Sequence, residues 1–153
     1  MTEQSSQAFK EFITATVGSQ LFGLPILRVQ DVFVPERIAR VPLAGADIAG
    51  VLNLRGRIVT LIDVRRRLGL PARANEAQPM AIGVEARGES YGLLVDAVGE
   101  VVKLDEASLE ANPVNLDAEL AAVSAGIFRL EGQLLVVIDV DRVLDLGTRG
   151  IAA

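Results

Sequence analysis

The chain contains the same pattern twice. Residues 50–70, GVLNLRGRIVTLIDVRRRLGL, align without gaps with residues 126–146, GIFRLEGQLLVVIDVDRVLDL, and nine of the 21 positions are identical. Upstream of these copies, residues 23–32 match residues 92–101, so the order of segments is the same in both halves. Most of the differing apolar positions exchange one aliphatic residue for another. The repeat therefore predicts two similar units that bury a shared core.

Glycine-containing turns divide both repeats into short apolar runs that read as β-hairpins. One hairpin is centred on Gly18-Ser19 and its counterpart on Arg87-Gly88-Glu89. The runs that flank these two turns are residues 12–17, 20–24, 80–86 and 90–95. Two further turns, at Arg55-Gly56 and Glu131-Gly132, lie inside the repeated segment. Gly56 and Gly132 occupy equivalent positions, and we expect both to be structural turn residues.

Short helices and loops are expected around these strands. Asp63 and Asp139 follow the final strand of each repeat and are suitable N-caps for helices over residues 64–68 and 140–144. The segment 104–122 is expected to form loop with a little helix. The polar segment 71–79, bounded by proline, reads as the linker between the halves.

This pattern favours a mainly β fold of two small barrels around one core, because closing a sheet removes its unpaired edges. Half of the residues are hydrophobic but only 4% are aromatic, so Val, Leu, Ile and Ala must fill the interior. We expect the first barrel at about residues 13–70 and the second at about 80–140, and an exchange of terminal segments between them is left open. Residues 1–8 and 147–153 are expected to be flexible ends.

Composition excludes several classes of function. The chain has no His and no Cys, which removes the commonest general base, thiolate metal sites and cysteine nucleophiles. The net charge of -5 disfavours nucleic-acid binding. No apolar run is long enough to span a bilayer, and the polar N-terminus shows no signal sequence. We therefore expect a cytoplasmic protein without cofactor or metal, which neither binds nucleic acid nor inserts into a membrane.

The residues resemble the CheW-like domains of bacterial chemotaxis. The run GVLNLRGRIVTLIDVRRRLGL is very similar to the signature segment of that family, and YGLLVDAVGEVVKLDEASLEANP resembles its second half. The resemblance covers residues 9–146 as a single domain and implies two SH3-like five-stranded β-barrels packed together. It implies a non-catalytic adaptor, monomeric in isolation, that couples the cytoplasmic signalling tip of chemoreceptors to the regulatory domain of the histidine kinase CheA in membrane-associated arrays.

The resemblance also implies a receptor-binding groove between the barrels. In the family an arginine of the NLRG segment and an acidic residue are associated with receptor coupling, and these match Arg55 and Asp31. Asp31 is one methylene shorter than the family's usual glutamate, so whether the two residues form an ion pair is left open. The aliphatic positions of the groove match Val29, Ile38, Val98 and Val101. A groove whose two walls come from equivalent positions of the two repeats would suit an amphipathic receptor helix.

The kinase-facing surface is expected on the first barrel, and the residues assigned to it are Arg40, Val41, Pro42 and Gly50. The repeat offers a test of these assignments within the chain. Arg55 aligns with Glu131, so the fold does not require arginine there and a functional role is favoured. Asp31 aligns with Glu100, which keeps the charge and favours a structural role.

Two other functions stay open at this point. A CheW-like coupling protein could serve a non-flagellar pathway that controls pilus motility or gene expression, and nothing in the residues separates the pathways. A small ligand-binding or enzymatic β-barrel with a buried carboxylate is the second alternative. The sequence contains neither a phosphate-binding loop nor a G-x-S-x-G turn.

Overall fold

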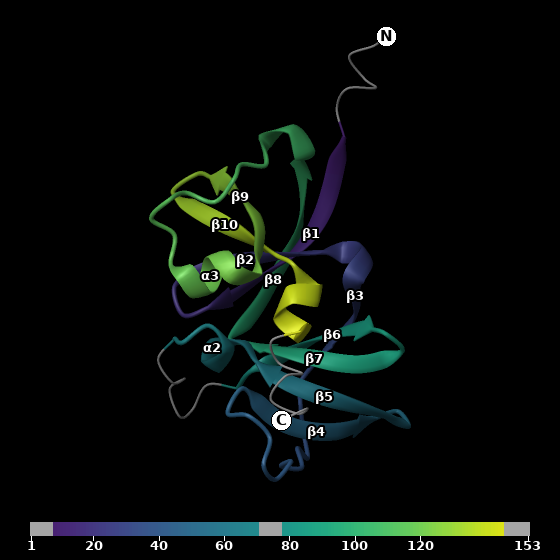
Figure 1. Ribbon diagram of the computed structural model, residues 1–153. Helices are drawn as coiled ribbons and strands as arrows, with labels where there is room; N and C mark the ends of the chain where they lie inside the picture. Colours follow the sequence, from purple (N-terminus) through teal and green to yellow (C-terminus); the bar gives the residue numbers. More distant parts are fainter. Residues whose placement is uncertain (1–7, 71–77, 146–153) are drawn as a thin grey trace.

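The structure is a computed structural model that describes residues 8–70 and 78–145. Within these residues the chain forms two five-stranded sheets, one above the other in Figure 1. Sheet A has the order β8 (Ala97–Asp105), β1 (Phe9–Val17), β2 (Gln20–Pro25), β10 (Gln133–Ile138) and β9 (Ser124–Leu130). Sheet B has the order β3 (Val29–Phe33), β6 (Met80–Ala86), β7 (Glu89–Val95), β5 (Arg57–Asp63) and β4 (Ile48–Leu54). The mainly β prediction is confirmed.

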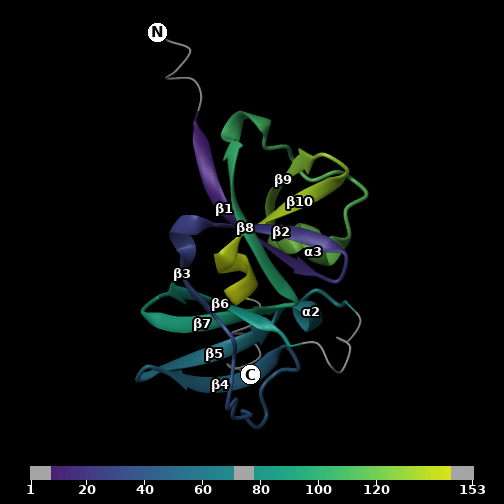
Figure 2. The same cartoon turned by 180° about the vertical axis from the view of Figure 1, so that it is seen from behind.

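Each sheet takes strands from both repeats. β1 and β2 of the first repeat pair with β8, β9 and β10 of the second, whereas β3, β4 and β5 of the first lie with β6 and β7. The sheets therefore do not follow the division into residues 13–70 and 80–140, because the first two strands of each repeat lie in the sheet formed by the last three strands of the other. The chain crosses between sheets directly after β2 and after β7, so neither repeat completes a sheet alone (Figures 1 and 2).

The local predictions from turn chemistry are confirmed. Hairpins β1–β2 and β6–β7 pair in antiparallel register around Gly18-Ser19 and Arg87-Gly88. β4–β5 and β9–β10 pair around the two turns of the repeated segment. Parallel contacts then join the hairpins, β2 with β10 and β5 with β7.

Short helices complete the fold. Asp63 caps α2 (Val64–Arg67) and accepts a hydrogen bond from the backbone N–H of Arg66. Asp139 accepts one from the backbone N–H of Arg142 at the start of a helix over residues 140–145. The segment 104–122 carries η2 (Glu106–Ser108) and the start of α3 (Ala118–Val123), and the remainder is mostly loop. Another short helix, η1 (Ile26–Arg28), follows β2.

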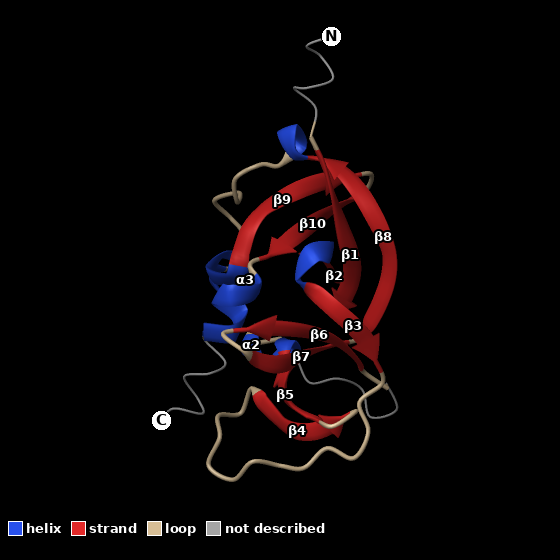
Figure 3. Cartoon of the chain, turned by 90° about the vertical axis from the view of Figure 1, so that its right-hand side faces the viewer, coloured by secondary structure: helices blue, strands red, loops and turns tan. Residues whose placement is uncertain are grey.

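The two edges of each sheet approach each other through single bridges. Ala39, in the loop after β3, exchanges two backbone hydrogen bonds of 2.8 Å with Val51 of β4. Glu110, beyond β8, does the same with Ile127 of β9 at 2.8 and 2.9 Å. Figure 3 shows that these two loops lie at opposite ends of the molecule. Each sheet is thus strongly curled, as expected for an SH3-like arrangement.

One apolar core joins the sheets. It contains Phe22 and Leu24 of sheet A, Ile82 and Leu93 of sheet B, and Leu144 of the C-terminal helix, all nearly inaccessible to solvent. Smaller clusters fill each curled sheet, around Phe12 and Phe128 in sheet A and around Leu61 and Leu94 in sheet B. The shared interior that the repeat predicts is confirmed.

Some expectations lie outside the described residues. These are most of the linker 71–79 and the two ends of the chain, of which only Ala8 is described. Among residues 8–70 and 78–145, no helix combines the length and apolarity needed to cross a bilayer.

Candidate partner-binding surfaces

Asp31 and Arg55, which we call the coupling pair, come together across the curled sheet B. Asp31 lies on β3 and Arg55 opens the β4–β5 turn, at opposite edges of the sheet. Arg55 Nη1 nevertheless lies 3.5 Å from Asp31 Oδ2. The two charges therefore form an ion pair, which answers the question that the sequence left open. The 3.5 Å separation is long for such a contact, as the short aspartate side chain leads us to expect.

The local backbone holds both members of the coupling pair. Asp31 pairs with Gly83 on β6, and a Cβ atom on Gly83 would lie 2.1 Å from Asp31 Oδ1. The carboxylate thus occupies space that only glycine leaves open, and 22% of its side chain is exposed. Arg55 has φ 52°, a left-handed conformation that disfavours a long side chain, and 72% of its side chain is exposed.

This unfavourable backbone bears on the role of Arg55. The equivalent residue Glu131 does not adopt a positive φ, so the repeated turn can be built without the strain. A left-handed non-glycine residue costs on the order of 1–3 kcal/mol, and such residues cluster at functional sites. An exposed ion pair stabilises the folded state by only about 0–1 kcal/mol. Stability alone therefore does not account for arginine at this position.

The aliphatic residues assigned to the groove occupy two kinds of place. Val29 and Val98 are half-buried and pack against the shared core, and they pair with Val84 and Ala15 at equivalent positions of the two sheets. Val101 is 49% exposed on β8 of sheet A. Ile38 is 39% exposed in the loop beside β4 of sheet B. That these four residues line one groove stays a prediction.

Of the residues assigned to the kinase-facing surface, Arg40, Val41 and Pro42 lie on the loop of residues 34–47, which we call the β3–β4 loop, and Gly50 lies on β4. Arg40 and Val41 line a surface hollow of about 440 Å³ together with Asp63 and Arg66. Pro42 is exposed. Gly50 is buried, and its missing Cβ leaves room for the backbone of Ala39, so it can contribute to this surface only by holding the loop.

Sequence reasoning missed Leu43 at the tip of this loop. Its side chain is fully exposed and its backbone has φ 66°, so it combines apolar exposure with a strained conformation. The equivalent loop of sheet A likewise exposes Val114 completely. A large aliphatic residue within a segment of Pro, Gly and Ala was the signal available in the sequence. Binding residues are commonly carried on loops, so both side chains are candidates for contact with a partner.

The loop is anchored at its C-terminal end. The N–H of Asp63 donates to the carbonyl oxygen of Asp47 at 2.7 Å, and Arg67 Nε lies 3.7 Å from Asp47 Oδ2. Both contacts tie the loop to α2 and β5.

No group of three or more metal-binding side chains occurs in the described part of the chain.

Comparison with known proteins places the chain in a family. The family model of the CheW-like domain matches residues 11–147. The chemotaxis protein CheW of Rhizobium meliloti is 27% identical over 134 residues, which cover 88% of this chain and 86% of the relative. That of Bacillus subtilis is 28% identical over 136 residues, which cover 89% and 87%. The crystal structure of the scaffolding protein TtCheW from Thermoanaerobacter tengcongensis has 32% identity and a TM-score of 0.76, with coverage of 86% and 89%. The resemblance seen in the sequence is confirmed, and the chain belongs to the family of CheW-like domain proteins.

Proposed function

We propose that this chain is a chemotaxis adaptor that catalyses no reaction and couples chemoreceptors to the histidine kinase CheA. The coupling pair and the groove residues face the receptor tip, and residues 40–43 of the β3–β4 loop face the regulatory domain of the kinase. The chain is a monomer in isolation and acts at membrane-associated receptor arrays. Its relatives are named chemotaxis proteins and a scaffolding protein, which supports this class of function.

The coupling pair is the observation that carries the proposal. Arg55 is exposed and held in a strained backbone conformation, beside a carboxylate that a glycine accommodates. The equivalent residue of the second repeat, Glu131, does not share this conformation. An arginine presented in this way offers five hydrogen-bond donors and a charge to a partner helix.

The chain offers a matched control for Arg55. Arg87 also opens an Arg-Gly turn, also has φ 52°, and has 67% of its side chain exposed. It also contacts a carboxylate, because Arg87 Nη2 lies 2.6 Å from Asp145 Oδ1. The two arginines therefore share backbone strain, exposure and charge, and differ in where they lie on the molecule.

The test is a binding titration with a receptor cytoplasmic fragment, followed by amide chemical shifts. Arg55→Ala should weaken receptor binding by roughly tenfold, as for a residue that contributes more than about 1 kcal/mol to an interface. Arg87→Ala should leave the affinity unchanged. Equal affinities for the two variants would refute the assigned role of Arg55. Failure of the unaltered protein to bind either receptor or kinase at tens of micromolar would refute the adaptor function itself.

The kinase-facing surface is tested in the same way with the regulatory domain of CheA. Leu43→Ser removes an apolar side chain that contacts solvent, so it should weaken kinase binding while leaving stability unchanged. Val114→Ser removes an equally exposed side chain from the equivalent loop of sheet A and serves as the control. If Val114→Ser weakened kinase binding and Leu43→Ser did not, the kinase-facing surface would belong to sheet A.

A further inference from the structure

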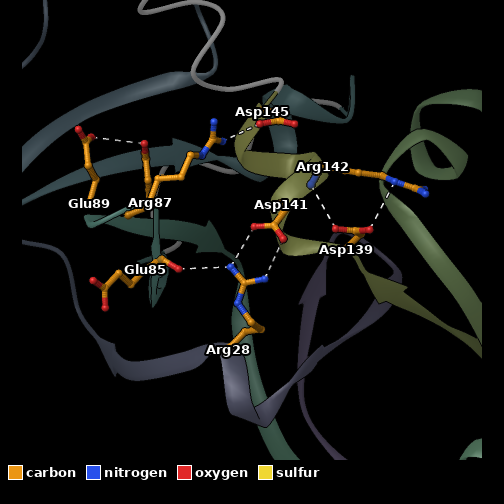
Figure 4. A network of polar contacts seen from close by, with 9 residues as sticks. Arg28, Glu85, Arg87, Glu89, Asp139, Asp141, Arg142 and Asp145 are labelled. Atoms are coloured by element: carbon orange, nitrogen blue, oxygen red, sulfur yellow. Dashed lines mark hydrogen bonds and ion pairs between the residues drawn. The ribbon is translucent and has the colours of Figure 1, made fainter.

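Two ion pairs occupy equivalent places in the two sheets, and we call them the latch pairs. In sheet A, Arg28 at the end of η1 contacts Asp141 in the helix that follows β10, with Nη2–Oδ1 and Nη1–Oδ2 distances of 3.1 and 3.2 Å (Figure 4). In sheet B, Arg65 in the helix that follows β5 donates to Asp96, directly after β7. Each pair therefore joins the two segments that directly follow the parallel strands of its sheet, β2 and β10 in sheet A and β5 and β7 in sheet B.

The latch pairs are related by the repeat but have opposite polarity. The alignment of residues 50–70 with 126–146 places Arg65 at the position of Asp141. The alignment of the upstream segments places Asp96 within one residue of the position of Arg28. The helix supplies the acid in sheet A and the base in sheet B. The segment that follows β2 supplies the base in sheet A, and the segment that follows β7 supplies the acid in sheet B.

Both latch pairs lie where the chain leaves one sheet for the other, and both also contact the hairpin that begins the other repeat, in the opposite sheet. Arg28 Nη2 donates to the carbonyl oxygen of Glu85 at the end of β6 over 3.3 Å (Figure 4). The N–H of Asp96 donates to the carbonyl oxygen of Thr16 at the end of β1 over 2.9 Å, and its Oδ2 accepts from the N–H of Gly18 over 2.7 Å. The latch pairs thus occupy the two crossover points.

A second arrangement of the same strands would keep every hairpin. The hairpins β4–β5 and β9–β10 could change places, because each follows a long segment, residues 34–47 and 106–123, and this would put β2 beside β5 and β7 beside β10. The local turns and the apolar periodicity are the same in both arrangements, and they give no preference between them. The charges at the crossovers differ, however. In the second arrangement Arg28 would face Arg65, and Asp96 would face Asp141.

We propose that the opposite polarity of the latch pairs selects the observed arrangement of strands, in which β10 lies beside β2 and β5 beside β7. The observed fold satisfies both pairs, whereas the alternative creates two like-charge contacts at once. The contact in sheet B is largely buried, with 11% of the Arg65 side chain exposed, so an unpaired or repelled charge there is especially unfavourable. Charge patterns that penalise a competing structure are a common source of structural specificity.

The test exchanges the charges of one latch pair, using Arg28→Asp together with Asp141→Arg. The observed arrangement keeps an opposite-charge pair in sheet A, so this variant should still fold. The alternative arrangement now has opposite charges at both crossovers and loses its penalty. Each exposed contact changes the ratio of the two arrangements by up to about fivefold. After refolding from urea, we expect a second set of amide resonances, with cross-strand contacts between β2 and β5.

Two further variants make the experiment decisive. Adding Arg65→Asp and Asp96→Arg inverts both pairs, restores their opposite polarity and should return a single set of resonances. Exchanging Arg87 with Asp145 is the control, because that ion pair involves the same C-terminal helix but aligns with Gly18 and Gly69, which carry no charge. The control should give one set of resonances.

The outcome that overturns the proposal is specific. If the Arg28/Asp141 exchange gives one set of resonances, with contacts only between β2 and β10 such as Phe22 to Val136, the polarity of the latch pairs does not choose the arrangement. The comparison with the Arg87/Asp145 control decides the question even if the fourfold variant does not fold, because each double variant keeps an opposite-charge pair. A second set of resonances in the control as well would equally refute the proposal.

Discussion

Replacement of Gly50 by alanine tests how the β3–β4 loop is held against sheet B. Gly50 is buried on β4 and has φ 146°, a conformation that L-residues rarely adopt. A Cβ atom there would lie 2.5 Å from the carbonyl oxygen of Ala39 and 2.6 Å from Ile38 Cγ2. The side chain of Ile38 can rotate away, but the carbonyl of Ala39 accepts the 2.8 Å hydrogen bond from the N–H of Val51. The loop must therefore move and lose its bridge to β4.

The expected loss of stability follows from these two effects. The unfavourable backbone conformation costs about 1–3 kcal/mol. Crowding against a packed backbone costs about 1–3 kcal/mol more. Gly50→Ala should thus lower the free energy of unfolding by about 2–6 kcal/mol, a large part of the roughly 5–15 kcal/mol of a typical domain. Urea denaturation followed by far-ultraviolet circular dichroism measures this, because the chain has no tryptophan for fluorescence.

Gly56→Ala separates the two effects. Gly56 also has a positive φ, 87°, but a Cβ atom there would meet nothing within 4 Å. It should show only the backbone cost, so the difference between the variants isolates the contact with the loop. A loss for Gly50→Ala no larger than that for Gly56→Ala would refute the reasoning. Kinase binding by Gly50→Ala should weaken as well, because the displaced loop carries the proposed kinase-facing residues.

Three further predictions concern stability. Asp63→Ala removes the side-chain cap on the N–H of Arg66 and should lower the unfolding free energy by about 1 kcal/mol in urea denaturation, whereas Asp63→Asn should keep most of it. Leu135→Ala, at a fully buried position, should cost about 2–5 kcal/mol by the same measurement, and a cost under about 1 kcal/mol would contradict the packing described here. Burial, followed by the nearby charge of Glu89, raises the pKa of Tyr91 above its usual value near 10. The folded state then binds the phenolic proton more tightly, so stability is fully present below about pH 10 and falls as the pH rises through the raised pKa. Tyr91 is the only tyrosine, so phenolate absorbance reports it alone; a titration at the value of free tyrosine, or an unchanged alkaline stability profile in Tyr91→Phe, would contradict this.

Local features of this protein could be predicted because their causes are local. The turns at Gly18, Gly56, Gly88 and Gly132 are set by residues within two or three positions, and so are the helix starts at Asp63 and Asp139. The shared core also follows from the sequence, since aliphatic residues recur at the same positions of both repeats. The family follows as well, because its signature segment is continuous in the chain.

The candidate site was predicted in part. Arg55 was separated from Gly56 because the two copies of the turn differ at the first position and agree at the second. Its contact with Asp31 depends on the curl of sheet B, which brings strands at opposite edges together. The strained exposure of Leu43 likewise depends on how the loop is anchored at both ends, through Ala39 and Asp47.

The sequence by itself determined the two repeats, their hairpins, their helix caps and the aliphatic interior, since each depends on residues close together in the chain or on composition. Only the tertiary structure decided which repeat supplies each strand of a sheet, and therefore where Arg28, Asp96 and the coupling pair find their partners. The physical reason is the duplication. Two similar units present equivalent strand edges, so neither strand propensity nor apolar periodicity distinguishes a strand's own repeat from the other. That choice depends on contacts between residues far apart in the chain.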